Sequence, residues 1–252
     1  MSNNRYDANR FFLKDSIRKQ IDFSRTAQNR GLPAPPCQKL CPPDAPRIGL
    51  PDGAVALRRY GMMPVSAVIA LRESVRQYSA APLALEELSA LLWATQGVRR
   101  ILSSESALRT VPSAGARHCF ETYLVVNRVE TLSAGLYRYL PFDRQLAQLR
   151  LDDQIGRKAA MACFGQDFIA QAAVTFFWTV IPSRMEWRYD LAAHKVMAID
   201  AGHVCQNLYL AVQSIGAGVC AIAAYDQEAC DDLLGVDGDD EFVVYLAPVG
   251  KK

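Results

Sequence analysis

The segment from Lys195 to Ile215 limits the possible folds of this chain more than any other stretch. Its pattern predicts a helix about 30 Å long, at 1.5 Å per residue, that is apolar almost all round. Polar side chains occupy only one narrow sector of this helix, and they are Asp200, His203, Asn207 and Ser214. Such a helix is stable only when other elements cover it, because exposed apolar surface is unfavourable in water.

The polar sector of this helix indicates how it is covered. A chain of 252 residues with 50% hydrophobic residues can bury such a helix within one large domain. A narrow polar stripe fits better where two subunits press together and share hydrogen bonds. We therefore expect a homodimer.

The overall charge excludes two classes of partner. The chain has 28 basic and 26 acidic residues, a formal charge of +2, so it has no strong field to attract nucleic acid or a membrane surface. Its first residues lack a signal-peptide core, and the longest apolar run, Ala172 to Ile181, is about half a membrane span. The expectation is a soluble, cytoplasmic protein without nucleic-acid or membrane partners.

The cysteines argue against both disulfides and a metal site. Seven scattered cysteines fit a reducing compartment rather than a disulfide framework. Cys37 and Cys41 lie close together, but no second pair of ligands follows at zinc-site spacing. His203 and Cys205 are two apart on the predicted helix and point to different faces. We expect no metal.

The remaining pattern predicts an α+β fold. Helices are expected over 11–23, 64–73, 85–96 and 155–171, and strands over 122–127, 136–140, 146–149, 173–180, 219–224 and 241–246. Gly97 suits a left-handed residue that ends the helix over 85–96. Because the order lacks strict βαβ alternation, we expect helices flanking a central, mostly antiparallel sheet.

The first 63 residues form a separate part of the predicted organisation. Seven prolines lie between Gly31 and Asp52, and this segment cannot be helix or central strand. Its interspersed apolar residues favour docking on a surface, of this subunit or of a partner, over free disorder. We expect an extension over 1–63, with a helix and a Pro-rich arm, and one domain over 64–252.

Two segments carry candidate binding chemistry. LRESVRQYS at 71–79 places Arg72, Ser74 and Arg76 together, and two guanidiniums with a hydroxyl suit a phosphate monoester. VPSAGARHCFETYLVV at 111–126 begins with a turn of small residues, which lets a flat or charged ligand approach backbone amides. An exposed Arg-rich helix end and an ordinary structural turn are the alternatives.

Other nucleotide and hydrolase motifs are excluded. The glycine run at 216–221 follows a predicted helix and precedes a predicted strand, the reverse of the dinucleotide-binding order. The sequence has no Walker A motif, and Ser113, His118 and Asp200 lack the GxSxG elbow of a hydrolase triad.

Four motifs in order carry a resemblance to a known family. Besides the two segments above, they are DAGHVCQNLYLAVQSIGAG at 200–218 and CAIAAYDQE at 220–228, followed by the terminal PVGKK. Together they resemble the FMN-dependent nitroreductase family, and within it the SagB-type dehydrogenase branch, which includes azoline oxidases of thiazole and oxazole peptide biosynthesis. The resemblance covers residues 64–252 and implies a dimeric, nitroreductase-like, FMN-binding domain built on a long central helix.

The resemblance also implies a set of cofactor contacts. Arg72, Ser74 and Arg76 would hold the FMN phosphate, with Lys251 or Lys252 as the C-terminal basic contact. Pro112, Ser113, Ala114 and Gly115 would reach the flavin of the neighbouring subunit, and His118 stands where the family has another contact residue, although Ala116, His118 and Phe120 replace the family's Asn, Gln and Trp. Ala223 and Ala224 would face the reacting edge of the flavin, and Gln166 lies near a further contact position.

The implied chemistry is hydride transfer from NADH or NADPH through flavin N5 to a small electrophile, such as a nitroaromatic or a quinone. Ala224 and Tyr189 are the predicted catalytic residues. Azoline oxidases use a Lys-Tyr pair where this chain has Arg188-Tyr189, and arginine is no base near neutral pH. Oxidation of azolines or other peptide-derived heterocycles is therefore the alternative, and flavin binding without turnover is a further one.

Overall fold

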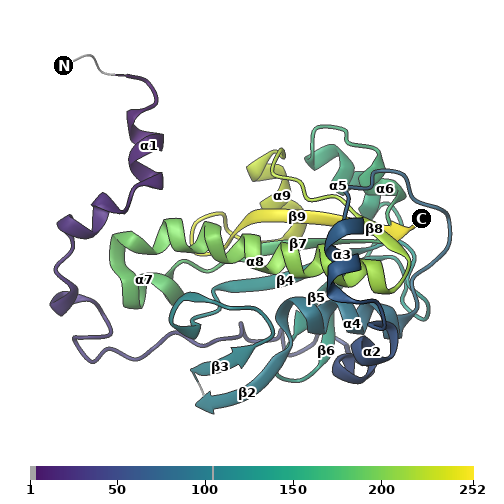
Figure 1. Cartoon of the computed structure of the whole chain (residues 1–252), viewed down its shortest axis with the longest axis horizontal. Helices are drawn as coiled ribbons and strands as arrows, with labels where there is room; N and C mark the ends of the chain where they lie inside the picture. The colour runs from purple at the N-terminus through teal and green to yellow at the C-terminus, as the bar shows by residue number, and fades with distance from the viewer. Residues whose placement is uncertain (1–3, 104) are drawn as a thin grey trace.

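A seven-stranded sheet forms the centre of the computed structural model, which describes residues 4–103 and 105–252 (Figure 1). Its strand order is β1-β6-β5-β4-β7-β9-β8, and neighbouring strands run antiparallel. In that order the strands are β1 (Arg47–Gly49), β6 (Gln145–Leu151), β5 (Gly135–Leu140), β4 (Phe120–Val126), β7 (Val174–Val180), β9 (Phe242–Lys251) and β8 (Ala217–Val219). The expected α+β fold with a mostly antiparallel sheet is confirmed.

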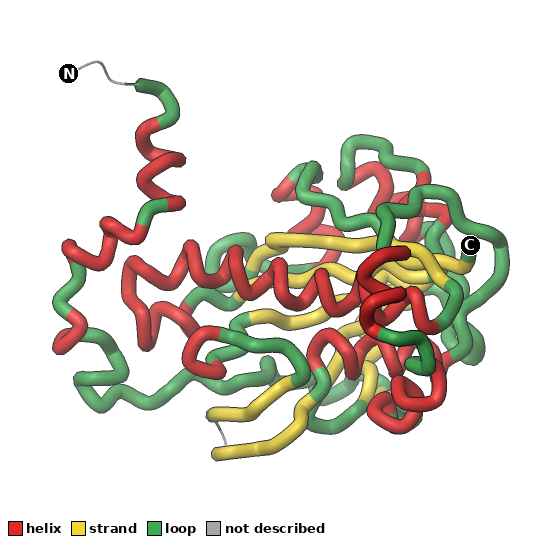
Figure 2. The backbone as a smooth tube through the Cα atoms, viewed as in Figure 1, coloured by secondary structure: helices red, strands yellow, loops and turns green. Residues whose placement is uncertain are grey.

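Helices cover both faces of the sheet (Figures 1 and 2). The helices of the chain are α1 (Asp7–Leu13), which stands apart from the sheet, and α2 (Gly53–Tyr60), α3 (Val65–Leu71), α4 (Leu85–Gln96), α5 (Ile155–Ala162), α6 (Phe168–Gln171), α7 (Ser183–Tyr189), α8 (Ala193–Ser214) and α9 (Gln227–Leu234). Alternate residues of β7 divide between two cores: Phe176 packs with α4 and α8, whereas Phe177 packs with α5 and α9. The strand is therefore buried along its whole length.

The long helix is close to its predicted length, but its polar residues behave differently from the expectation. Asp200 accepts a hydrogen bond from the Ala114 amide, and Asn207 donates one to the carbonyl of Ala94. These two side chains are thus satisfied within the chain rather than across a subunit contact. His203 remains largely exposed.

Several predicted elements are shorter or broken. The helix expected over 11–23 is divided into α1 and a 3-10 helix at Asp15–Gln20, both without buried residues to hold a longer helix together. The helix over 155–171 breaks at Phe164 and Gly165, which have positive φ angles of 58° and 73°. The strand expected over 219–224 ends at Val219, while β9 runs on to Lys251.

Other local predictions were wrong or incomplete. Gly97 has φ −59° and ψ 132°, so α4 ends in extended backbone rather than in a left-handed glycine. A hairpin of β2 (Val98–Ser103) and β3 (Ser106–Arg109) follows it, and neither this hairpin nor α2 and α9 was predicted. The hairpin is short, and most residues of β2 are exposed. Its sequence therefore lacks the hydrophobic alternation that would have predicted a strand.

The Pro-rich arm lies across its own chain. Carbonyls of Pro35, Cys37 and Leu40 accept hydrogen bonds from Arg117, Arg109 and Arg138, respectively. Further along, β1 pairs with β6 at the edge of the sheet, and α2 packs against α4. An edge position is where a proline-rich segment can join a sheet. The boundary at residue 63 stays a prediction.

Within the described residues, no single helix is long and apolar enough to cross a membrane. Only α2 and α3 taken together have that length and composition, and they are bent by 82° relative to one another.

A buried ion pair joins the sheet to α7 and generates the first testable prediction. Arg184 lies 2.6 Å from Glu121, and the two side chains are 1% and 2% exposed. Arg184→Met leaves the Glu121 carboxylate buried without its cation, so the free energy of unfolding should fall by about 3 to 5 kcal/mol. Urea denaturation followed by circular dichroism measures this loss.

The matched control is the exposed pair of Arg144 and Asp52, whose side chains are 57% and 45% exposed. Arg144→Met should change the free energy of unfolding by about 1 kcal/mol or less, because solvent screens such a pair. Equal effects of the two substitutions would show that the buried pair is not a major stabilising contact.

Candidate active site

The residues predicted to bind phosphate form a cluster beside the sheet, which we call the Arg72–Arg76 cluster (Arg72, Ser74 and Arg76). After α3 the chain runs alongside β8, where Ser74 pairs with Val219. Ser74 Oγ lies 2.9 Å from Tyr209 Oη, and the Tyr209 ring lies beneath the Arg72 guanidinium at 5.5 Å. A tyrosine of α8 thus positions the cluster.

The charges of this cluster are uncompensated. Neither Arg72 nor Arg76 forms an ion pair with a carboxylate in the part of the chain that the structure describes, 4–103 and 105–252. Both side chains are accessible to solvent. Two unpaired guanidiniums and a hydroxyl are a suitable donor set for a phosphate monoester.

The two C-terminal lysines differ in their surroundings. Lys251 Nζ donates to Glu87 and, at 2.7 Å, to the carbonyl of Ile215. Lys252 Nζ lies 3.2 Å from Glu73, inside the segment that carries the Arg72–Arg76 cluster. Both lysines have a carboxylate partner, but the pair of Lys251 and Glu87 is largely buried, whereas that of Lys252 and Glu73 is exposed and lies beside the Arg72–Arg76 cluster. Lys252 is therefore the nearer candidate for a basic contact.

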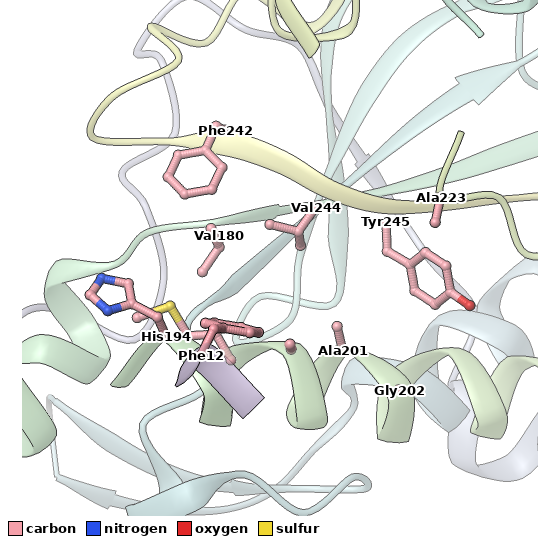
Figure 3. Close-up of a pocket in the computed structure, with 11 residues that line it drawn as sticks. Phe12, Val180, His194, Ala201, Gly202, Ala223, Phe242, Val244 and Tyr245 are labelled. Carbon is pink, nitrogen blue, oxygen red and sulfur yellow. The ribbon is translucent and has the colours of Figure 1, made fainter. Parts of the chain in front are cut away.

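An apolar cavity of about 490 Å³ lies between α8 and β9 (Figure 3). This volume is within the usual range for small-molecule sites. Its lining residues are Phe12, Val180, His194, Met197, Ala198, Ala201, Gly202, Ala223, Phe242, Val244 and Tyr245. Ala201, Gly202 and Ala223 are small, so a flat ring can approach the backbone there.

The cavity and the Arg72–Arg76 cluster lie on the same side of α8. Gly202 lines the cavity and Tyr209 holds the cluster. Seven residues separate them, which corresponds to about 10 Å along the helix and nearly two full turns. A ligand with a flat apolar end and a phosphate end can therefore span both features along one helix face.

Free backbone donors accompany one lining residue of the cavity, because Ala223 lines it and Ala224 is the next residue along the chain. Within the described parts of the chain, the amides of Ala223 and Ala224 have no hydrogen-bond acceptor. Gln166 donates from Nε2 to the carbonyls of Ala224 and Cys163, each at 2.9 Å. Gln166 thus holds the loop that presents these amides, which is a supporting position; its predicted contact with the flavin stays a prediction.

The turn at Pro112–Ala116 is fixed to the other side of α8. Asp200 Oδ2 accepts a hydrogen bond from the Ala114 amide at 3.1 Å, and Gly115 and Ala116 have left-handed backbone with φ 58° and 53°. Burial raises the pKa of Asp200, while its hydrogen bonds to Ser113 and Ala114 oppose that rise.

Tyr189 lies against this turn. A Cβ placed on Gly115 would be 2.7 Å from Tyr189 Oη, so only glycine allows this close approach. The structure therefore brings the predicted catalytic residue Tyr189 together with the turn.

The turn and the Arg72–Arg76 cluster do not face one cavity within a single chain. Asp200 and Tyr209, which hold them, are nine residues apart on α8. Nine residues correspond to about 180° of rotation and 13 Å of rise, so the two features lie on opposite sides of the helix.

His118 lies inside the protein rather than at the surface of the turn. It is 4% exposed, its amide donates to Ser113 Oγ, and its ring is held by the backbone of Ala107. Burial, reinforced by the positive charge of Arg109, lowers the pKa of His118 to about 3. This position favours a structural role, and contact with a flavin stays a prediction.

Two residues support the site in ways that the sequence did not predict: Tyr209 was not singled out, and, as a site residue, Asp200 was considered only as the acid of a hydrolase triad and rejected. Tyr209 accepts from the Ala221 amide at 2.9 Å as well as contacting Ser74, and Asp200 holds the turn. The sequence held a signal for each residue. Helical spacing places Tyr209 on the same face as Gly202. Asp200 lies on an otherwise apolar helix, and a buried aspartate needs hydrogen-bond donors.

The fold and the site together define a class of redox protein. The profile of the Nitroreductase family matches residues 69–251, and the chain belongs to this family, whose members are oxidoreductases that generally bind FMN. Membership of this family agrees with the geometry of the site. Arg72, Ser74 and Arg76 form a suitable donor set for the phosphate of FMN, and the apolar walls of the cavity suit its flavin ring.

Several similar proteins are themselves described as nitroreductases. A protein of Methanocaldococcus jannaschii named as a putative nitroreductase is 34% identical over 185 residues, which are 73% of this chain and 89% of that relative. Structures described in the same way from Ralstonia eutropha and Anabaena variabilis are 28% and 26% identical, with TM-scores of 0.65 and 0.66. They cover 87% and 83% of this chain, which spans 98% of the Ralstonia chain and 42% of the Anabaena chain.

A relative of another kind is the trifolitoxin-processing protein TfxB of Rhizobium leguminosarum bv. trifolii. It is 24% identical over 147 residues, which are 57% of this chain and 39% of that protein. The chain thus spans less than half the length of this relative.

The buried imidazole predicts a pH dependence of stability. His118 has a pKa near 3 when folded and an ordinary value near 6.5 when unfolded. The unfolded state therefore binds the extra proton first, and stability should be lost as pH falls from 6.5 towards 3, by up to about 1.4 kcal/mol per pH unit.

Urea denaturation of the wild type and of His118→Gln at pH 7.5, 5.5 and 4.5 tests this dependence. The free energy of unfolding of the wild type should fall more steeply with acid than that of the variant, because glutamine does not titrate. Parallel pH profiles would mean that His118 is not buried as a neutral group.

Proposed function

We propose that this chain is a homodimeric FMN-dependent oxidoreductase that uses NADH or NADPH to reduce a small electrophile of nitroaromatic or quinone type. The observation that carries the proposal is the arrangement along one face of α8. Two unpaired guanidiniums, Arg72 and Arg76, lie at one end, and an apolar cavity with the open amides of Ala223 and Ala224 lies at the other.

The residues of the chain have separate tasks in this reaction. Arg72, Ser74 and Arg76 hold the phosphate through charge-assisted hydrogen bonds. The apolar walls around Gly202 exclude water from the reacting edge. The amides of Ala223 and Ala224 stabilise negative charge at that edge without any rearrangement. FMN, when bound there, supplies hydride transfer at N5.

Tyr189 is the proposed proton donor or wall of the acceptor pocket. Its Oη lies against Gly115, so its position depends on the turn. A phenol held beside backbone amides can donate a hydrogen bond or a proton to a reduced acceptor.

The proposed homodimer follows from the division of the site over two sides of α8. The turn at Pro112–Ala116 and the Arg72–Arg76 cluster lie on opposite sides of this helix, so a turn from a second chain is needed to complete each cavity. The exposed face of α8 carries Ala198, Ile199 and Gly202, and α3 exposes Val65 and Ile69. A two-fold dimer buries such self-complementary apolar faces.

A dehydrogenase that oxidises azolines or other peptide-derived heterocycles is the second candidate. It is favoured by the likeness to TfxB, whose name assigns it to the processing of a peptide toxin. It is opposed by Arg188, which takes the place of the family's lysine base. Consumption of NADH or NADPH with a nitroaromatic or quinone, and no turnover of an azoline peptide, would favour the first candidate.

Removal of a guanidinium tests the phosphate assignment. Arg72→Ala should weaken FMN binding by about ten- to a hundredfold, because a charge-assisted hydrogen bond contributes about 1.5 to 3 kcal/mol. Quenching of flavin fluorescence on titration measures the dissociation constant. Arg157→Ala, an exposed arginine on α5, is the control and should bind FMN as the wild type does. Equal affinity of the two variants would contradict the assignment.

A charge on the exposed face of α8 tests the dimer. Ile199 is 50% exposed in the single chain, and Ile199→Asp would place a carboxylate in the proposed subunit contact. Sedimentation velocity should show a two-chain species for the wild type and a single chain for the variant. The control is Met161→Asp, since Met161 is an exposed apolar residue of α5, a helix that packs in a different core cluster from α8. A monomeric wild type would overturn the proposed dimer.

A further inference from the structure

A second cavity, separate from the one between α8 and β9, lies where the N-terminal extension crosses α7. Its volume is about 450 Å³, and its lining residues are Arg18, Phe23, Gln28, Asn29, Arg188 and Tyr189. The first four come from the extension, before the residues that match the Nitroreductase family. We call this cavity the arm pocket.

The extension is held in place beside α7 (Figures 1 and 2). The Gln28 amide donates to the carbonyl of Trp187 at 2.9 Å, and Trp187 Nε1 donates to the carbonyl of Leu32 at 2.9 Å. Lys195 Nζ lies 3.5 Å from Asp15 Oδ1. Side-chain and backbone contacts on α7 and α8 therefore fix the wall that the extension provides.

The arm pocket is positively charged. Arg18 uses Nε for an ion pair with Asp15 at 2.9 Å, which leaves the terminal nitrogens of its guanidinium as donors. Arg188 has no carboxylate partner in the described parts of the chain, and its guanidinium lies 5.6 Å from the centre of the Tyr189 ring. No acidic side chain lines the pocket among the residues that the structure describes.

Its donors converge with aromatic surface. Gln28 and Asn29 add side-chain amides, and Phe23 and Tyr189 add rings. A planar guanidinium beside an aromatic wall is well suited to a carboxylate or phosphate carried on a flat, unsaturated group.

The arm pocket adjoins the turn at Pro112–Ala116. A Cβ placed on Gly115 would lie 2.8 Å from Arg188 Nε and 2.7 Å from Tyr189 Oη. Arg188 and Tyr189, two of the six residues that line the pocket, thus also contact the turn that is proposed to reach the reacting edge. A ligand in the pocket would be next to that edge.

We infer that the arm pocket binds the oxyanion of a substrate, a carboxylate or phosphate, and so selects anionic over neutral substrates of the proposed oxidoreductase. The inference deepens that proposed function and rests on it. Two substrates could carry this oxyanion. The acceptor could carry it as an aromatic carboxylate, and the electron donor could carry it as the extra phosphate that distinguishes NADPH from NADH.

Direct binding distinguishes the two sources. Isothermal titration of the full-length protein with 4-nitrobenzoate and with its neutral isostere 4-nitrobenzamide gives one ratio of dissociation constants, and titration with NADPH and NADH gives another. Arg188→Met should reduce one of these ratios by about ten- to a hundredfold, because it removes a charge-assisted contact and keeps the side-chain length. The ratio that changes identifies the source of the anion.

Further variants separate charge from folding. Arg188→Lys should restore part of the lost preference, Arg18→Met should also reduce it, and Arg157→Met on α5 should leave both ratios as in the wild type. Unchanged ratios in a folded Arg188→Met protein, or a wild type without preference for either anion, would overturn the inference.

The same titrations keep this inference distinct from the proposed function. If the protein binds no FMN but still prefers an anion through Arg188, the pocket is supported and the proposed function fails. If FMN binds and neither ratio depends on Arg188, the proposed function stands and the arm pocket has another role.

Discussion

The structure depends on the need to cover α8 on nearly every side. The sheet covers one side of this helix, α4 covers another, and the turn at Pro112–Ala116 binds it through Asp200. Each covering element also brings residues of the site to the helix, because Tyr209 fixes the Arg72–Arg76 cluster in the same way that Asp200 fixes the turn. The long apolar helix is therefore both the centre of the core and the part that sets the spacing of the site.

Buried charge explains the path of the Pro-rich arm. Arg109, Arg117 and Arg138 are almost fully buried, and each donates to a carbonyl of the arm. A buried guanidinium without acceptors is strongly unfavourable, so the carbonyls of the arm complete a set of acceptors that α4 and α7 supply only in part. Prolines suit this task, since they keep the arm extended and leave its carbonyls free. The arm thus completes the fold, and the residues of the extension that precede it, from Arg18 to Asn29, provide one wall of the arm pocket.

The sequence was sufficient where a pattern was long or chemically specific. Hydrophobic periodicity predicted α8 and the central strands, and the spacing of Arg72, Ser74 and Arg76 predicted a cluster that the structure does bring together. Prediction failed where tertiary contacts decide. Phe164 and Gly165 break a helix through left-handed backbone, and within the chain Asp200 finds a donor and Asn207 an acceptor. The role of His118 depends on burial, and burial of a single polar residue has no periodic signal.

The central claim is that each site combines the Arg72–Arg76 cluster of one chain with the turn of the other. The most direct measurement mixes two inactive variants, Arg72→Ala/Arg76→Ala and Gly115→Val, after joint unfolding and refolding, and follows the FMN-dependent consumption of NADH or NADPH. Half of the dimers should then be mixed, with one intact site each, so activity should recover to roughly a quarter of the wild type. No recovery on mixing, although each variant refolds and dimerises, would show that cluster and turn act within one chain and would contradict the account.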